Sequence, residues 1–140
     1  MSESRQLVRE LLQSIADTVD TLLALDDADL DAACSHGCAM NGGIRRLLVH
    51  NAEHDRMHAG TISTARYEGR TMQESELARL VRDLLRERVE LVGQLLNTPD
   101  DVLALKAKGD EWDVRKHVKH VLAAERDSMA TVLAEQGIGK

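Results

Sequence analysis

The sequence predicts an all-α protein, an up-down four-helix bundle made of two helical hairpins that repeat one another. Apolar residues recur at three- and four-residue spacings in four long segments, and no segment alternates as a strand does. Pro99 is the only proline, so long helices meet few interruptions. Phenylalanine is absent and there is one tryptophan and one tyrosine, so aliphatic side chains have to fill the core.

The first two expected helices span residues 3–25 and 41–65. Their apolar positions are Leu7, Leu11, Ile15, Val19 and Leu22 in the first, and Ile44, Leu47, Leu48 and Ile62 in the second. This spacing places the apolar residues of each segment on one face of a helix. The glycine in "YEGRT" marks the end of the second segment.

The other two expected helices span residues 73–96 and 113–136. Their apolar positions are Leu77, Leu80, Val81, Leu84, Val92 and Leu95 in the third, and Val114, Val118, Val121, Met129 and Val132 in the fourth. Turn-forming residues in "NTPDD" and the glycine in "KAKGDEW" separate these two segments.

The two halves of this single expected domain, about 1–70 and 71–140, align at an offset of 70 residues. The matched pairs include Leu7 with Leu77, Arg9 with Arg79, Val19 with Val89, Arg45 with Arg115, His50 with His120 and Arg56 with Arg126. Chance similarity between amphipathic helices is the alternative, but the histidine and arginine matches are not explained by core filling. A repeated hairpin predicts a bundle with pseudo-two-fold symmetry.

Composition narrows the class of protein. Charged residues make up 30% of the chain and apolar residues 43%, a balance typical of soluble globular proteins. The net charge of −6 and the absence of a basic stripe argue against nucleic acid as a partner. No apolar run approaches the roughly 18 residues that a membrane span needs. The N-terminus does not resemble a signal peptide, so we expect a cytoplasmic protein with no membrane contact.

Four polar residues fall within the apolar faces of the expected helices: Asn51, Asp55, Arg88 and Glu125. Burying such groups is costly unless they are paired. One interpretation is a structural pair between Arg88 and a carboxylate that fixes helix register. The other is a polar cavity between the helices, which is where bundles build ligand and metal sites.

The stretch "HNAEHDRMH" places His50, His54 and His58 at steps of four residues. Side chains four residues apart lie about 6 Å apart along a helix and can share one metal ion, whereas the outer two lie about 12 Å apart. Either His50 with His54 or His54 with His58 therefore forms the pair. The third ligand has to come from another helix, where His120 is the best candidate, with His117 or Glu125 behind it.

At these residues the chain resembles the DinB/YfiT-like superfamily of four-helix bundles. The segment "LLVHNAEHDRMHAGTI", residues 47–62, is similar to the histidine-rich helix of that family. The segment "WDVRKHVKHVLAAE", residues 112–125, is similar to its tryptophan helix, including the step from Trp112 to His120 and the following Glu125. Together the two motifs cover about 30 residues.

The resemblance implies a divalent metal, typically zinc or nickel, held by a histidine triad of His120 with His54 and His58. It also implies an enzyme that acts on a small molecule, for some relatives a thiol-dependent transferase or isomerase that uses a low-molecular-weight thiol, and commonly a homodimer. Two departures leave the choice between His50 and His58 open. The tryptophan helix follows the histidine-rich helix here instead of preceding it, and "IRRLLVH" gives the second helix the single-histidine pattern as well.

The loop "CSHGC", residues 34–38, is a second candidate site. Cys34, His36 and Cys38 could hold zinc with a fourth ligand or act as a redox pair, and the alternative is a pair of idle thiols in a cytosolic loop.

Three functions compete. The first is a metal-dependent transferase or hydrolase, with Asp55 or Glu125 as orienting group or general base and Arg88 holding an anionic group of the substrate. The second is a non-catalytic dimeric binding or stress-related bundle. The third is a small-molecule binding or pH-sensing module that uses the six histidines.

Overall fold

The computed structural model describes residues 2–96 and 98–137. It is all-helical, with four long α-helices: α1 (Glu3–Leu22), α2 (Gly43–Glu68), α3 (Glu76–Leu95) and α4 (Val114–Gln136). Short 3-10 turns lie between them, η1 (Asp29–Asp31), η2 (Gly37–Ala39) and η3 (Val102–Ala104). The described residues form no β-strand, and an isolated antiparallel bridge joins Lys106 to Asp113.

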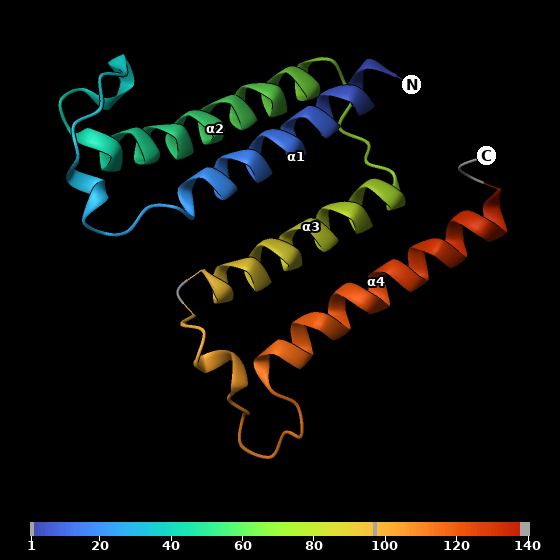
Figure 1. The fold of residues 1–140 in the computed structure, drawn as a ribbon. Coiled ribbons are helices and arrows are strands. Elements are labelled where there is room, and N and C mark those ends of the chain that lie inside the picture. The colour runs from blue at the N-terminus through green and yellow to red at the C-terminus, as the bar shows by residue number, and fades with distance from the viewer. Residues whose placement is uncertain (1, 97, 138–140) are drawn as a thin grey trace. The chain divides into compact units, whose positions relative to one another are not determined.

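The chain divides into two compact units, Met1–Gln73 and Glu74–Lys140. Each unit contains two long helices that run in opposite directions, α1 with α2 in the first and α3 with α4 in the second (Figure 1). The all-α class and the number of long helices predicted from the sequence are confirmed. The up-down bundle and its pseudo-two-fold repeat stay predictions from the sequence.

Local capping sets where the helices begin. The Ser75 hydroxyl accepts a hydrogen bond from the Ala78 N–H at 3.1 Å, so α3 starts at Glu76 instead of residue 73. The Asp113 carboxylate accepts a hydrogen bond from the Lys116 N–H at 2.7 Å, so α4 starts at Val114, one residue later than expected. At its other end α4 stops at Gly137, which adopts the left-handed conformation that ends many helices.

The start of α2 also differs from the expectation of residue 41, and a glycine explains why. Asn41 has a φ of 65°, which is not helical, and Gly43 has a φ of 66°. A Cβ atom at Gly43 would lie 2.6 Å from the carbonyl oxygen of Ala32, so both the conformation and the close approach require glycine. The Ile44 N–H donates to the same Ala32 oxygen at 3.2 Å. This contact fixes the loop after η1 against the first turn of α2.

An ion pair reinforces that junction. Arg45 in the first turn of α2 donates through Nε and Nη2 to Oδ1 of Asp31 in η1, at 3.2 and 3.1 Å. The junction also contains Ala39, the one fully buried apolar residue among those described. The helix that carries the three histidines is therefore anchored at its N-terminal end.

The apolar faces of the long helices are largely exposed in the described structure. Leu11 of α1 is 71% exposed and Leu77 of α3 is 70% exposed. The central core expected from the sequence is thus not closed within either unit. No helix in the described ranges is long and apolar enough to cross a membrane.

Candidate metal centre

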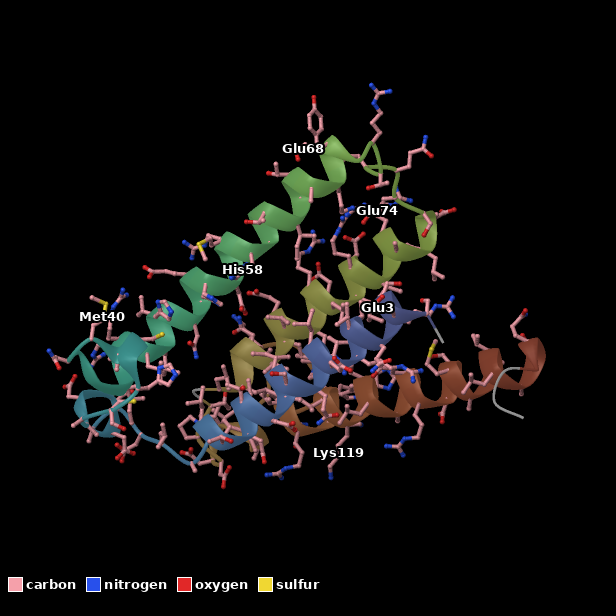
Figure 2. All side chains as sticks on the ribbon, turned by 90° about the horizontal axis from the view of Figure 1, so that it is seen from above. Glu3, Met40, His58, Glu68, Glu74 and Lys119 are labelled. Atoms are coloured by element: carbon pink, nitrogen blue, oxygen red, sulfur yellow. The ribbon has the colours of Figure 1, made fainter. Side chains whose placement is uncertain are left out.

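His50, His54 and His58 follow one another along α2, and His54 and His58 are the closest pair. The Nε2 atoms of His54 and His58 lie 3.2 Å apart, and their ring centroids are 4.4 Å apart. The rings of His50 and His54 are more widely separated, at 5.6 Å between centroids. His58 lies well inside α2 and away from both of its ends (Figure 2). Of the two pairs left open by the sequence, the geometry favours His54 with His58.

The spacing of these two nitrogens fits a shared metal ion. Zinc–nitrogen bonds measure about 2.0–2.1 Å, so two nitrogens on one tetrahedral zinc lie roughly 3.3–3.4 Å apart. The observed distance of 3.2 Å between the two Nε2 atoms is close to that value. The same distance allows one ring N–H to donate to the other ring, and metal titration distinguishes the two arrangements. Both side chains are exposed, so an ion could reach them from solvent.

Asp55 and Asn51 lie on the side of α2 that faces α1. Together with His54 and residues of α1 they line a cavity of about 220 Å³. The two α1 residues with hydroxyl groups there are Ser14 and Thr18, which are not among the residues predicted from the sequence. The sequence does contain a sign of these two residues, because hydroxyl side chains four residues apart interrupt the apolar series of α1.

In the second unit, Arg88 and Glu125 form an ion pair between α3 and α4. Nη2 of Arg88 donates to Oε2 of Glu125 at 2.8 Å, and the two side chains are 32% and 39% exposed. Arg88 also lines a mostly apolar cavity of about 210 Å³ with Leu91, Val118 and neighbouring residues. The carboxylate partner expected for Arg88 is therefore Glu125, and the pair joins the two helices of this unit.

His120, the single ligand expected from the sequence, lies on α4 beside Trp112. The ring centroids are 4.9 Å apart, with the rings nearly perpendicular. Lys116 holds its ammonium 4.8 Å from the centroid of the same indole. The only tryptophan of the chain thus contacts the histidine proposed as a ligand.

His117, the reserve candidate, has another partner. Its Nε2 lies 2.9 Å from Oδ2 of Asp110, in the loop before α4. The Trp112 N–H donates to Oδ1 of Asp110 at 2.9 Å, and this hydrogen bond, with a smaller contribution from His117, lowers the pKa of Asp110 below its usual 3.8. The contact between His117 and Asp110 therefore joins the first turn of α4 to the loop that precedes it.

The "CSHGC" loop has a structural role for its histidine. His36 caps η2, where its Nδ1 accepts from the Cys38 N–H at 3.3 Å. Cys34 and Cys38 are half-buried free thiols. Within residues 2–96 and 98–137, no three or more histidine, cysteine or acidic side chains gather as a metal-binding group.

Comparisons with known proteins add no relative to this picture. No protein-family model matches the chain, and neither the curated proteins nor the solved structures contain a match.

Proposed function

We propose that this protein binds a divalent metal ion, zinc or nickel, through His54 and His58, and that the bound ion serves a transferase or hydrolase reaction on a small molecule. The observation that carries the proposal is the 3.2 Å separation of the two Nε2 atoms. Imidazole nitrogen is a good ligand for both metals. His120 is the third ligand proposed from the sequence.

A divalent ion held there would act as a Lewis acid toward a water molecule or a low-molecular-weight thiol. The residues of the chain have separate tasks. His54 and His58 supply neutral nitrogen ligands, and Asp55 follows His54 directly, beside the cavity, where its carboxylate can orient a polar group or accept a proton. Arg88 is paired with Glu125, so we assign these two residues first to joining α3 and α4.

The resemblance to the DinB/YfiT-like superfamily supports this proposal through the motifs on α2 and α4. A homodimer in the cytoplasm remains part of the same proposal. The competing function, a non-catalytic dimeric binding or stress-related protein, would need no metal. The exposed apolar faces of α1 and α3 are compatible with either one.

The experiment is elemental analysis of protein purified without a histidine tag and incubated with zinc or nickel. We expect about one ion per chain in the wild type and none in a His54→Ala/His58→Ala double variant. Replacement of His36, which caps η2, by alanine is the matched control and should leave the metal content unchanged. A wild-type protein that binds neither metal would remove the proposal in favour of the non-catalytic one.

A further inference from the structure

The loop that precedes α2 (Figure 1) is closed at its base by the start of that helix. On one limb, the carbonyl oxygen of Ala32 accepts a hydrogen bond from the Ile44 N–H at 3.2 Å. On the other limb, the carbonyl oxygen of Ala39 accepts from the Gly42 N–H at 2.7 Å, and Ala39 itself is fully buried. The chain therefore contacts the start of α2 at residue 32, moves away from it, and returns to it at residue 39.

The two cysteines of the chain lie on opposite limbs of this loop. Cys34 follows the first contact by two residues, and Cys38 directly precedes Ala39. Both cysteines are half-buried, whereas the residues between them, 35–37, are exposed. A tight turn joins the limbs, because the Ala39 N–H donates to the carbonyl oxygen of His36 at 2.9 Å. With the base closed and the tip formed by a tight turn, the fold holds the two thiols near one another on the less exposed side of the loop.

The histidine of the loop is occupied by a backbone contact. Nδ1 of His36 accepts a hydrogen bond from the Cys38 N–H at 3.3 Å, so the neutral ring carries its proton on Nε2. In this arrangement neither ring nitrogen has a lone pair free for an ion. The sequence leaves zinc binding and thiol redox chemistry open for this loop, and the bond made by His36 favours the chemistry that needs only the two thiols.

We propose that Cys34 and Cys38 are a dithiol site that hydrogen peroxide oxidises to an intrachain disulfide and that a small thiol such as glutathione reduces again. This inference goes beyond the proposed function, because it uses neither the metal ion nor the histidines of α2.

The oxidation runs in two steps. One thiolate attacks the peroxide, so that an S–O bond forms, the O–O bond breaks, and the leaving hydroxide takes a proton to become water. The other thiolate then attacks the sulfenic sulfur, so that the S–S bond forms and a second hydroxide leaves as water. The protons come from the two thiols as they ionise. Two thiols thus lose two electrons, which reduce one peroxide to two waters. Reduction runs through two thiol–disulfide exchanges, which convert two molecules of the small thiol into its own disulfide.

The test follows the redox state of the full chain by intact mass and by thiol alkylation. Cys34 and Cys38 are the only cysteines in the sequence, so both measurements report on this pair alone. Peroxide should leave a monomer that has lost two hydrogen atoms and takes up no alkyl group, and dithiothreitol should restore both thiols. The variants Cys34→Ser and Cys38→Ser should instead gain an oxygen, as a sulfenic acid that dimedone traps. A wild type that stops at the sulfenic acid, or that forms disulfides only between chains, would overturn the proposal.

A second measurement separates the effect of the fold from that of the short spacing. The disulfide is equilibrated with reduced and oxidised glutathione, once in buffer and once in urea that unfolds the chain. We expect the equilibrium constant for disulfide formation to be at least about tenfold larger in the folded chain, because the closed base already restricts the loop. Equal constants in the two conditions would overturn the role of the loop.

Two glycine variants of the folded protein test the closed base directly. In Gly43→Ala, the new Cβ would lie 2.6 Å from the Ala32 oxygen at the base, so the advantage of the folded chain should decrease. The matched control is Gly60→Ala, within α2, where a Cβ meets nothing within 4 Å, and it should keep the full advantage. The same loss in both variants would contradict the role of the base.

Zinc is the competing ligand for this loop. It is tested in the His54→Ala/His58→Ala variant, which lacks the metal site proposed above. One equivalent of zinc should leave the rate of peroxide oxidation unchanged in this variant. Protection of the thiols by zinc would show a metal site in the loop and overturn the assignment of a redox pair.

Discussion

The ion pair between Arg88 and Glu125 should contribute measurably to the stability of the α3–α4 hairpin. The two charged atoms are 2.8 Å apart, a short charge-assisted hydrogen bond, but the side chains keep 32% and 39% of their exposure. Exposed pairs contribute about 0.2–1 kcal/mol, whereas hydrogen bonds to buried charges contribute more. We therefore expect a coupling free energy near the upper end of the exposed range, about 1 kcal/mol.

The assay is a double-mutant cycle of Arg88→Met and Glu125→Gln followed by urea unfolding. The coupling should decrease in high salt, because screening weakens partly exposed pairs. A cycle on Arg79 and Glu76 of the same helix is the control. Those atoms are 3.6 Å apart and the side chains are 57% and 78% exposed, so their coupling should be near zero. A coupling for Arg88 and Glu125 no larger than that of the control would refute the structural role of the pair.

Three further predictions concern the ends of the helices and the indole. Gly43→Ala should destabilise the protein by roughly 1–3 kcal/mol in urea unfolding, because the left-handed φ of residue 43 and the nearby carbonyl oxygen of Ala32 leave no room for a Cβ atom. An unchanged urea midpoint of unfolding would contradict this prediction. The pKa of Asp110 is lowered, so its contribution to stability is present above the usual pKa of 3.8 and is lost as the pH falls through the lowered pKa. The variant Asp110→Asn should not show this loss of stability at acid pH. Identical profiles of unfolding free energy against pH for the two proteins would contradict this prediction. Nickel bound at His120 should quench the fluorescence of Trp112, because the ring centroids of the two residues are 4.9 Å apart. The variant His120→Ala should abolish this quenching. Equal quenching in the wild type and the variant would exclude His120 as a ligand.

The sequence predicts the helices well where the signal is local. Helix α4 begins after Asp113 and ends before Gly137, because a carboxylate cap and a left-handed glycine act within a few residues. The start of α2 was placed too early because it depends on Gly43 approaching Ala32 of the preceding loop. That contact joins residues that no periodicity relates. The closing of a central core is also non-local, and apolar spacing alone does not specify it.

The candidate metal site, like the helices, was predictable from the sequence only where the signal is local. Helical periodicity identified His54 as a member of the pair in either arrangement, because it lies between the other two histidines. It could not choose between His50 and His58, since that choice depends on ring orientation, which spacing does not specify. Ser14 and Thr18 interrupt the apolar series of α1, but the sequence does not show that α1 and α2 line one cavity, so the two residues were not predicted.

The most direct measurement of the metal hypothesis is the zinc affinity of three proteins, the wild type, His58→Ala and His50→Ala. The Nε2 atoms 3.2 Å apart belong to His54 and His58, so His58→Ala should weaken zinc binding by at least tenfold while His50→Ala changes it little. The opposite ranking, or equal affinity in all three proteins, would contradict the pairing of His54 with His58.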